Sequence, residues 1–471
     1  MKGLIWFRED LRLHDNTALY HAARQCEEGI IGIYIIDTHF WKKHRMAACR
    51  VQFLLTGLLE LSQNLQSRNI PLIIKQVKKT GDIPEILYQN IKKYKLDTLF
   101  FNKQYEIDEK RRDKIVCNYL NQHGIKCIAY DDQVILTPGI VQTKQGKPFR
   151  IFTPYKRAYL QLLLNNKTSV PHYSLPKPQH TLEIRSSRVP LKLIDFSTTI
   201  IWPSGEKEAQ RRLKKFIKNE LFSYHKTRDF PALEGTSLLS PYLATGMISP
   251  RKCLLAALMA NKGEFAGGNK GATTWINELI WRDFYKHLLD AIPRLSMHQP
   301  YRLETEKLKW KYNQKQLHAW QQGNTGYPIV DAGMRQLKKI GWMHNRLRMI
   351  VAMFLSKNLF FDWRLGEDFF IRHLIDGDLA ANNGGWQWSA STGTDAVPYF
   401  RIFNPLRQSE RFDPQGDFIR QYCPELRSFD ARTIHDPHQR APVLALKSGY
   451  PKPIIDFKSS RMATIKAFKS L

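Results

Sequence analysis

The amino-acid sequence predicts two folded parts. The first is an N-terminal α/β domain with a doubly wound, Rossmann-like, parallel sheet of five strands, and the second is an all-α C-terminal domain. From residue 2 to about 130, short apolar runs alternate with amphipathic helical stretches, as in successive β-α-β units. From about residue 205 onward, nearly every stretch has the helical period. The chain of 471 residues is long enough for two or three domains.

The five predicted strands are residues 3–7, 30–36, 72–77, 98–102 and 125–130. Runs this short and this apolar are typical of strands buried on both faces of a parallel sheet. Ligands of such sheets bind beyond the carboxyl ends of the strands. After the first strand the chain reads Phe7-Arg-Glu-Asp-Leu-Arg-Leu-His-Asp and not G-x-G-x-x-G. We therefore expect no standard dinucleotide site in this domain.

The predicted domains are residues 1–133 and 205–471, joined by an interdomain linker at 134–204. Residues 165–200 are rich in Ser, Thr, Pro and Lys, and their four prolines break any helix. In the helical domain we expect helix starts at Ser240-Pro241 and Ser249-Pro250. There serine can cap the helix and proline can occupy its first position.

Composition restricts the partners and the location of the protein. The chain carries 72 Lys and Arg against 43 Asp and Glu, a formal net charge of +29. This favours a polyanionic partner, nucleic acid first and a membrane surface second. The six cysteines have no metal-binding spacing, which indicates a reduced cytoplasmic protein without structural zinc. No signal peptide and no run near eighteen apolar residues is present in the sequence.

Residues 376–388 read Asp-Gly-Asp-Leu-Ala-Ala-Asn-Asn-Gly-Gly-Trp-Gln-Trp. This is not the pattern of an amphipathic helix or strand, so we predict a loop that binds a flat ligand. Gly384 and Gly385 would allow close approach or a positive φ. The alternative is a buried loop whose tryptophans fill the core. Asp-x-Asp can hold a divalent metal, but no histidine or third acid stands at ligand spacing, and we expect no metal.

The predicted helix 271–290 has two different faces. Its apolar stripe is Ile276, Ile280, Phe284 and Leu288. Its opposite face is Glu278, Trp281, Arg282 and Tyr285. A carboxylate, two aromatic rings and a guanidinium can stack a base, bond its edge and approach a phosphate. The alternative is a partly exposed surface with a Glu278–Arg282 ion pair.

A second predicted helix, 341–359, has the same division. Its core positions are Leu347, Ile350, Val351 and Phe354, and its other side carries Asn345, Arg348 and Met349. Arg348 could pair with Asp376 or Asp378, in a ligand site or as a structural ion pair. The hydroxyls at Thr236, Ser237 and Ser240 suit a phosphate, although Ser-Pro at a helix start is also ordinary capping.

Together these stretches resemble the photolyase/cryptochrome flavoprotein family, most closely the bacterial class I cyclobutane pyrimidine dimer photolyases. The matching motifs are Trp6-Phe-Arg-Glu-Asp-Leu-Arg-Leu-His-Asp15, Arg228-Asp-Phe-Pro, Trp275-Ile-Asn-Glu-Leu-Ile-Trp-Arg-Asp-Phe-Tyr, Gly341-Trp-Met-His-Asn-Arg-Leu-Arg-Met, residues 376–388 and Tyr399-Phe-Arg-Ile-Phe-Asn-Pro. The resemblance implies an antenna-binding N-terminal domain and a helical domain that binds FAD. It also implies a carbon–carbon lyase that repairs pyrimidine dimers in DNA with light.

The resemblance implies that the flavin is held by Tyr224, Thr236, Ser237, Leu238, Leu239, Ser240, Trp275, Arg348, Asp376, Gly377, Asp378 and Asn382. Asn382 would lie beside flavin N5 and favour reduced, anionic FADH⁻. Excited FADH⁻ would give an electron to the dimer, the ring would split, and the electron would return. Trp386, Trp363 and Trp310 would carry the electrons that reduce oxidised flavin.

DNA contacts are implied for Arg228, Glu278, Trp281, Arg282, Tyr285, Asn345, Arg346, Met349, Trp388 and Gln408. Trp281 and Trp388 would sandwich a dimer flipped out of the duplex, and Glu278 would hydrogen-bond it. These two tryptophans favour a duplex substrate over single strands. The partner would be UV-damaged DNA, bound by a monomer that needs no other protein and is associated with a bacterial nucleoid in the cytoplasm.

Two other functions compete with repair. A cryptochrome-type photoreceptor would signal through a protein partner, but such members usually carry a long C-terminal tail, whereas this chain ends with residues 457–471. A DNA-binding protein without a chromophore is the remaining alternative.

The antenna site departs from the family pattern. Folate-binding relatives carry Asn-Glu where this chain has Asp108-Glu109, and Cys-Lys where it has Ser296-Met297. We expect 5,10-methenyltetrahydrofolate, with a deazaflavin or an empty site as alternatives. Acids in the first turn of a helix are the structural explanation of Asp108 and Glu109.

Overall fold

A computed structural model describes residues 1–165, 170–195 and 200–471 of the chain. The chain divides into two compact units. Unit 1 comprises Met1–Phe222, Ser237–Pro293 and Asp376–Ala380, and unit 2 comprises Ser223–Thr236, Arg294–Ile375 and Ala381–Leu471. This division does not follow the predicted boundaries at 133/134 and 204/205, which remain predictions. Within the predicted linker, residues 166–169 and 196–199 lie outside the described residues.

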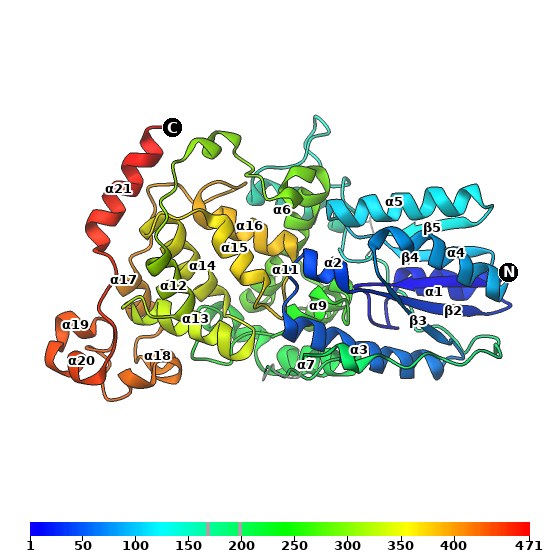
Figure 1. Cartoon of the computed structure of the whole chain (residues 1–471), viewed down its shortest axis with the longest axis horizontal. Helices are drawn as coiled ribbons and strands as arrows, with labels where there is room; N and C mark the ends of the chain where they lie inside the picture. The colour runs from blue at the N-terminus through cyan, green and yellow to red at the C-terminus, as the bar shows by residue number, and fades with distance from the viewer. Residues whose placement is uncertain (166–169, 196–199) are drawn as a thin grey trace. The chain divides into compact units, whose positions relative to one another are not determined.

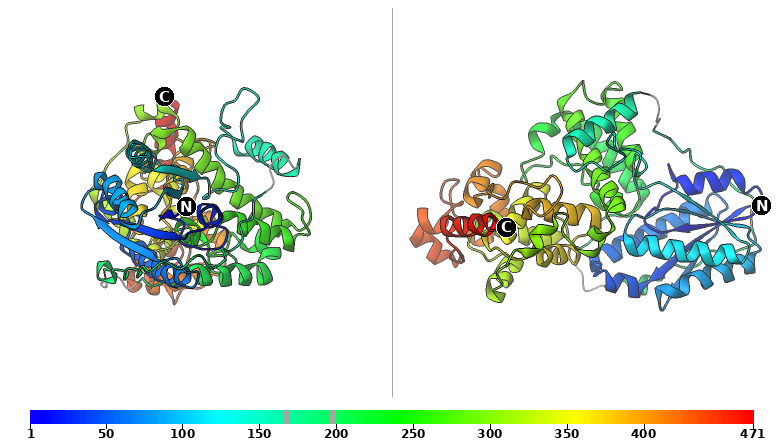
Figure 2. Two further views of the ribbon diagram at one scale, coloured as in Figure 1. Left: turned by 90° about the vertical axis from the view of Figure 1, so that its right-hand side faces the viewer. Right: turned by 90° about the horizontal axis from the view of Figure 1, so that it is seen from above.

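Unit 1 contains the predicted parallel sheet, in the order β3-β2-β1-β4-β5 (Figure 1). Its strands are β1 (Gly3–Phe7), β2 (Ile30–Asp37), β3 (Leu72–Val77), β4 (Thr98–Asn102) and β5 (Lys126–Tyr130). The register pairs Gly3 with Ile30 on one side and with Thr98 on the other. All residues of β1 and β4 are buried, as expected for central strands covered on both faces. The sheet is twisted (Figure 2).

Helices cover both faces of the sheet. They are α1 (Thr17–Gln25), α2 (Thr38–Lys43), α3 (Ala48–Gln66), α4 (Ile83–Tyr94) and α5 (Ile107–Gln122). Helices α4 and α5 lie on one side and α3 on the other (Figure 1). On the first side, Leu87 of α4 and Val116 of α5 belong to one buried cluster with Trp6 and Phe101 of the sheet. The predicted doubly wound fold is therefore confirmed.

The strand order reverses between β1 and β4, where a doubly wound sheet usually binds its ligand. In this protein its own side chains fill the place. Asn102, the last residue of β4, donates to Asp10 at 2.7 Å and accepts from the Ala18 N–H at 3.0 Å. Asp10 also accepts from the Arg8 N–H at 2.7 Å. The residues after β1 thus form a buried polar plug where other doubly wound proteins carry a phosphate-binding loop.

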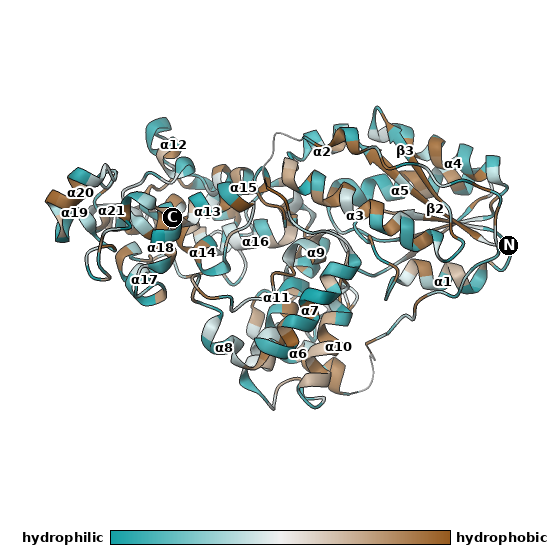
Figure 3. Ribbon diagram, turned by 90° about the horizontal axis from the view of Figure 1, so that it is seen from below, coloured by the Kyte–Doolittle hydropathy of each residue, from teal (hydrophilic) through white to brown (hydrophobic). Residues whose placement is uncertain are grey.

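Further helices complete unit 1. They are α6 (Phe152–Leu164), α7 (Glu206–Asn219), α9 (Ser240–Ala244), α10 (Pro250–Ala260) and α11 (Lys270–Ala291). Helix α6 lies within the stretch predicted as linker. Helix α7 is largely hydrophilic (Figure 3), and only one side of it is buried. As predicted, Ser249 caps α10 by accepting from the Lys252 N–H. The predicted cap at Ser240 is wrong, because Ser240 is already helical and Leu239 occupies the cap position.

Buried ion pairs attach α10 to the sheet region. Asp132, just after β5, accepts from Arg12 at 2.6 Å and from Arg251 of α10 at 2.8 Å. Arg251 also pairs with Asp15 at 3.0 Å. Although burial opposes it, the two guanidinium groups hold the pKa of Asp132 well below its usual range. These contacts explain why a segment of the helical half packs with the sheet.

Unit 2 is helical. Its α-helices are α8 (Tyr224–Thr227), α12 (Gln314–Gln322), α13 (Pro328–Ile340), α14 (Asn345–Met353), α15 (Trp363–Ile371), α17 (Pro405–Phe412), α18 (Asp417–Tyr422), α19 (Pro437–Arg440), α20 (Pro442–Ser448) and α21 (Phe457–Lys469). Helix α16 (Leu379–Ala390) begins in unit 1 and continues in unit 2.

The short 3₁₀ helices of the two units are η1 (Thr80–Asp82), η2 (Leu191–Leu193), η3 (Leu221–Ser223), η4 (Pro293–Met297), η5 (Leu303–Lys307) and η7 (Pro424–Leu426). The predicted helix 341–359 is in fact α14 followed by a π-helical turn, η6 (Phe354–Asn358). Across the described ranges, no helix combines the length and apolarity needed to span a membrane.

The prediction of a loop at residues 376–388 is wrong for most of that segment. Helix α16 starts at Leu379, and Gly384 and Gly385 lie in its interior without positive φ. Trp386 of this helix is buried in the core of unit 2. Two glycines disfavour an isolated helix, but tertiary packing of the tryptophan outweighs their low propensity. No amphipathic pattern is visible because polar side chains are buried on this helix together with the tryptophan.

We predict that Gly246→Ala destabilises unit 1 much more than Gly263→Ala. Both glycines have positive φ, +66° and +83°. A Cβ at Gly246 would lie 2.1 Å from the Glu9 carbonyl oxygen, whereas one at Gly263 would meet no atom within 4 Å. Backbone strain alone costs about 1–2 kcal/mol, and the clash should add roughly 2 kcal/mol or more. Urea unfolding measures both variants, and equal losses would contradict the prediction.

Candidate functional site

Helix α11 has the orientation predicted from its sequence. Ile276, Ile280, Phe284 and Leu288 are all buried. Glu278, Trp281, Arg282 and Tyr285 are half-buried. The helix thus presents one carboxylate, two aromatic rings and one guanidinium along an accessible line, as the stacking interpretation requires.

Neighbouring residues hold this face in place. The Trp281 ring stacks on Phe152 of α6, with centroids 3.6 Å apart and planes 9° from parallel. One face of the indole is therefore covered, and a flat ligand can stack only on the other face. The Arg282 guanidinium donates to the carbonyl oxygens of Gln133 and Leu243. These bonds orient Arg282 from within unit 1 and use two of its five N–H donors.

Sequence reasoning missed a buried polar line on α11, formed by Asp283, Lys286 and His287. Asp283 accepts from the Tyr159 hydroxyl at 2.7 Å and from the Ile135 N–H at 2.8 Å. His287 is bonded to the Leu136 carbonyl at 2.7 Å. Their spacing at i, i+3 and i+4 could have revealed this line, because it places three titratable residues on one face of a helix.

Lys286 is the most connected of these residues. Its ammonium lies 3.0 Å from Glu106, which precedes α5, and 2.8 Å from Asp378, and its side chain is 2% exposed. Burial alone would lower the pKa of Lys286, but the two carboxylates raise it above its ordinary value. The lysine thus stays charged and fixes the Asp376–Ala380 part of unit 1 to the helix that carries Glu278.

The segment Ser237–Ser240, predicted to bind the flavin, has a strained backbone. Leu238 has a φ of +51°, a conformation that leucine rarely adopts. The chain then enters α9 through Leu239. Residues held in such conformations cluster at ligand sites, where the surrounding structure enforces them. Leu238 is the strained residue at the centre of the predicted cofactor segment.

In unit 2, a backbone carbonyl orients Asn382. Its side-chain nitrogen donates to the Glu367 carbonyl at 3.0 Å, and the residue is buried. Because a carbonyl can only accept, the amide oxygen of Asn382 must point away from Glu367. An acceptor is what the N5–H of a reduced flavin needs, so the observed orientation fits the expected cofactor. The Glu367 carboxylate also holds Asn383 at 2.8 Å and His298 at 2.8 Å.

The three matched tryptophans differ in exposure. Trp386 and Trp363 are 2% and 1% exposed, whereas Trp310 is half-buried and packs against Phe360 at 4.9 Å. Gly366 lets α15 approach Trp386, because a Cβ there would lie 2.0 Å from the indole. Sequence reasoning missed this glycine. This order, from buried Trp386 and Trp363 to half-buried Trp310, suits an electron-transfer path that ends near solvent.

Trp320 is a structural tryptophan in the same core. It is 0% exposed, lies 6.1 Å from Trp386 in edge-to-face geometry and donates to the Val351 carbonyl at 3.1 Å. Trp388, two residues after Trp386, is half-buried. The two tryptophans that end the segment 376–388 therefore have different environments.

Two predicted DNA contacts meet at Asp229. Arg346 of α14 pairs with it at 2.8 Å, and Arg228 lies 3.9 Å from the same oxygen. The Arg346 guanidinium also lies over Phe412 of α17, 4.2 Å from the ring centroid. Gln408 is one turn before Phe412 and has a buried side-chain oxygen without a partner among the described residues. Arg228, Arg346 and Gln408 thus lie in one neighbourhood of unit 2.

The second helix also divides as predicted. Leu347, Ile350, Val351 and Phe354 are buried. Asn345 is exposed, and Arg348 and Met349 are half-buried. Arg348 donates to the Met343 carbonyl at 2.8 Å. Of its two predicted acidic partners, Asp378 is paired with Lys286.

The predicted flavin ligands fall into both compact units. Unit 1 contains Ser237, Leu238, Leu239, Ser240, Trp275, Asp376, Gly377 and Asp378, and unit 2 contains Tyr224, Thr236, Arg348 and Asn382. Trp275 and Tyr224 are buried. Among the described residues, no three His, Cys, Asp or Glu side chains are arranged to hold a metal.

The two antenna candidates differ. Asp108 is engaged by Lys43 at 2.5 Å and by His44 at 3.3 Å. Glu109 is half-buried, and one of its oxygens is buried without a hydrogen-bond partner in the described structure. An unpaired buried carboxyl oxygen is expensive unless a ligand meets it. Glu109 therefore fits a ligand site better than Asp108 does.

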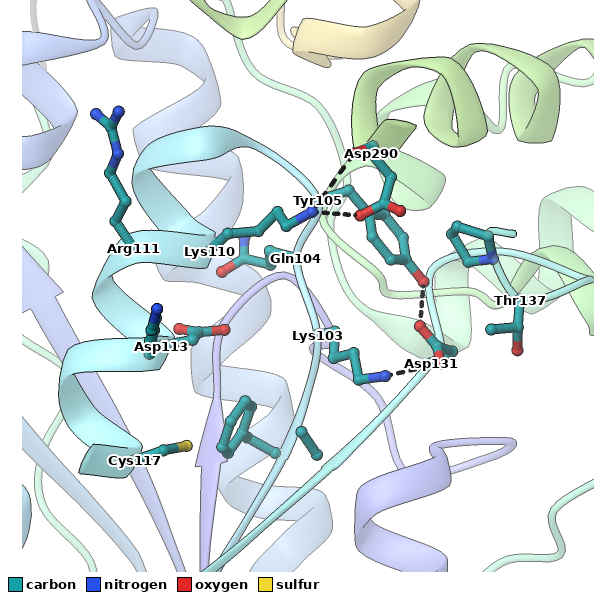
Figure 4. A pocket seen from close by; sticks show the side chains of 14 residues that line it. Lys103, Gln104, Tyr105, Lys110, Arg111, Asp113, Cys117, Asp131, Thr137 and Asp290 are labelled. Atoms are coloured by element: carbon teal, nitrogen blue, oxygen red, sulfur yellow. Dashed lines mark hydrogen bonds and ion pairs between the residues drawn. The ribbon is translucent and has the colours of Figure 1, made fainter. Parts of the chain in front are cut away.

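A pocket of about 520 Å³ lies beside α5, at the carboxyl ends of β4 and β5 (Figure 4). Within it, Asp131 accepts from the Tyr105 hydroxyl at 2.9 Å and pairs with Lys103 at 3.1 Å. Lys110 pairs with Asp290 at 2.7 Å. Neither Asp108 nor Glu109 lines this pocket. The predicted antenna residues are thus on another side of α5.

Comparisons with known proteins cover nearly the whole chain. A family model described as FAD binding domain of DNA photolyase matches residues 275–470, and one described as DNA photolyase matches residues 3–177. A deoxyribodipyrimidine photo-lyase of Escherichia coli K12 is 44% identical over 472 residues, covering 99% of this chain and 98% of that protein.

Two solved structures are similar over the full length. A bacterial class III photolyase from Agrobacterium tumefaciens superposes with a TM-score of 0.85 at 34% identity, covering 100% of this chain and 97% of that one. An archaeal photolyase from Sulfolobus tokodaii, crystallised with two FAD molecules, gives 0.85 at 30% identity and covers 100% of both chains.

We predict that Glu109→Gln stabilises the protein increasingly as the pH rises from about 4.5 to 8. Burial and the nearby Glu106 carboxylate raise the pKa of Glu109 from 4.5 to about 8. Between these values the folded protein keeps a proton that the unfolded chain releases, so the free energy of unfolding falls as pH rises. The glutamine variant should gain about 1–3 kcal/mol over wild type at pH 8–9 and nothing near pH 4.5.

Urea unfolding at the two pH values measures this difference. Glu27→Gln changes an exposed glutamate and is the control. A gain that is the same at both pH values would contradict the raised pKa.

Proposed function

This chain belongs to the DNA photolyase family, and we propose that Asn382, Glu278 and Trp310 have distinct roles in its reaction. The enzyme is a lyase that repairs pyrimidine dimers in DNA with light, and its cofactor is FAD. Relatives of 42–44% identity over 99% of the chain are photo-lyases, which supports repair over the cryptochrome alternative.

The orientation of Asn382 carries the proposal. Reduced flavin bound beside Asn382 would supply, when excited by light, the electron that splits the dimer. Asn382 would accept from N5–H, and its other end is tied to the Glu367 carbonyl at 3.0 Å. The amide therefore cannot rotate without losing a buried hydrogen bond. An amide oxygen held beside N5 would favour the protonated N5, which is the form found in the reduced cofactor.

The flavin would be held by residues of three segments. Thr236 to Ser240 offer hydroxyl and amide groups, Asp376 to Asp378 offer carboxylates and a glycine, and Tyr224, Trp275 and Arg348 complete the set. The Lys286–Asp378 pair supports this role, because it fixes the middle segment before any ligand arrives. Lys286 is thus proposed as a positioning residue.

The dimer would stack on the open face of Trp281, whose other face is covered by Phe152. Trp388 would complete the sandwich, and Glu278 would hydrogen-bond the pyrimidines. A dimer within a duplex must leave the base stack to reach such a pocket. Damage weakens its stacking and pairing, so the flipping cost is lower for a dimer than for intact bases.

Arginines would hold the DNA backbone. Arg228 and Arg346 are brought together by Asp229, at 3.9 and 2.8 Å. Arg282, Tyr285, Asn345, Met349 and Gln408 are the remaining proposed contacts. With a net charge of +29, the protein should bind duplex DNA with a strong dependence on salt. We propose that it acts as a monomer associated with DNA.

Tryptophans Trp386, Trp363 and Trp310 would carry electrons to oxidised flavin. The first two are buried and the third is half-buried, so an oxidised Trp310 could be reduced from solution. For the antenna, we propose 5,10-methenyltetrahydrofolate bound through Glu109. The Asp108 carboxylate is already engaged by Lys43 and His44.

Anaerobic blue-light illumination of reduced protein with a dimer-containing duplex tests the proposed reaction. Restored thymine absorbance is expected. Bound FADH⁻ with no repair would contradict it and favour a photoreceptor.

Glu278→Ala should lower the repair yield of bound dimers about fivefold, because a hydrogen bond to the substrate is worth about 1 kcal/mol. FAD absorbance should stay unchanged. Glu264→Ala, an exposed glutamate, is the control. Unchanged yield in the Glu278 variant would remove its proposed role.

Trp310→Phe should slow photoreduction of oxidised flavin at least tenfold, because phenylalanine is much harder to oxidise than indole. Repair by chemically reduced enzyme should be normal. Trp320→Phe replaces a tryptophan 6.1 Å from Trp386 and should keep photoreduction. A normal rate in the Trp310 variant would contradict the path.

A further inference from the structure

Unit 2 contains a basic pocket that none of the proposed roles uses. It has a volume of about 350 Å³ and lies where α13 meets α18 and η7. Its charged lining residues are Arg335, Lys338, Lys339 and Arg427, with no acid among them. The pocket beside α5 differs, because its four bases are accompanied by three acids. The pocket on α13 therefore carries an excess positive charge.

The floor of the pocket is rigid. Arg335 donates to the Gly323 carbonyl and to Asn324, both at 2.9 Å, and pairs with Glu425 at 2.7 Å. These bonds tie α13 to the preceding turn and to η7. They also neutralise Arg335, so it contributes structure and not free charge. Tyr422, which also lines the pocket, is buried.

Three cations remain at the rim. Lys338 and Lys339 are exposed in the last turn of α13, and Lys339 lies over the Tyr422 ring at 5.7 Å. Arg427 is also exposed and lines the pocket. Three exposed cations around a concave, rigid floor suit phosphate groups of a polyanion.

The chain places this pocket near the proposed DNA contacts. Lys339 and Asn345 are six residues apart, so their Cα atoms are at most about 22 Å apart. Helix α14, which begins at Asn345, directly follows α13 in the chain (Figure 1). Duplex DNA rises about 3.4 Å per base pair, so this separation corresponds to at most about six base pairs. A duplex held at Asn345 and Arg346 is therefore long enough to reach the pocket.

We propose that Lys338, Lys339 and Arg427 bind the phosphodiester backbone of the duplex that flanks the dimer. The inference rests on DNA binding by this enzyme and adds a second contact region outside the lesion pocket. Its contribution would be independent of sequence and sensitive to salt, because each neutralised phosphate releases counterions. It would strengthen binding without touching the reacting bases.

Binding of dimer-containing duplexes of two lengths tests the proposal. One duplex carries about ten base pairs on each side of the dimer and the other only one, which leaves almost no flanking backbone for the pocket to bind. For Lys338→Ala/Lys339→Ala, Kd on the long duplex should rise roughly tenfold at 0.1 M salt. The slope of log K for association against log salt is negative, and its magnitude should decrease by about 1.8. In Arg427→Ala the magnitude of this slope should decrease by about 0.9.

Kd on the short duplex should not change, and Lys338→Arg/Lys339→Arg should restore binding of the long one. Lys466→Ala/Lys469→Ala removes the same charge from the exposed face of α21 and is the control. Equal weakening on both lengths, or an unchanged salt slope on the long duplex, would overturn the proposal. Repair at saturating DNA reports on the reaction separately, and it should be normal in every variant.

Discussion

The buried ammonium of Lys286 is the constraint on which the site in unit 1 depends. It joins Glu106 at the start of α5 to Asp378, and it does so from the helix that carries the proposed dimer contacts. A charge this deeply buried is tolerated only while both carboxylates are present. The sheet domain, the helix and the acidic segment are therefore held in one geometry, and none of the three can shift alone without leaving a buried charge unpaired.

Helix α11 shows how one element serves three purposes at once. Its apolar line packs in the core, its half-buried line is the proposed DNA-binding face, and its buried polar line binds the sheet domain. Helix α16 is similar, since Asn382 and Trp386 are buried on it with different partners. Such helices lack simple amphipathic patterns because each face meets a different environment.

Local pattern was sufficient for the strands, for both faces of α11 and for the cap at Ser249. It failed at residues 376–388, because Trp386 packing against Gly366 outweighs the low helix propensity of two glycines. Lys286 and Glu367 were missed for a related reason. Lys286 pairs with Asp378, which is distant in sequence, and Glu367 binds Asn382 through its backbone carbonyl. Neither contact can be seen in the composition of the sequence or in its spacing. The roles of the flavin residues came from family resemblance, whereas helical spacing had already grouped Glu278, Trp281, Arg282 and Tyr285 on one face.

The contact between Phe152 and Trp281 also shows that the helical half of the chain depends on residues outside it. The phenylalanine belongs to α6, in the stretch that looked like a connector, yet it forms the back of the proposed dimer platform. A fragment beginning at residue 205 would contain Trp281 but not its backing ring, and it would contain Lys286 without Glu106. The photochemical half of this enzyme is thus not a self-sufficient cassette. Grafting it onto another N-terminal domain would require the connector and Glu106, the residue before α5, to be kept with it.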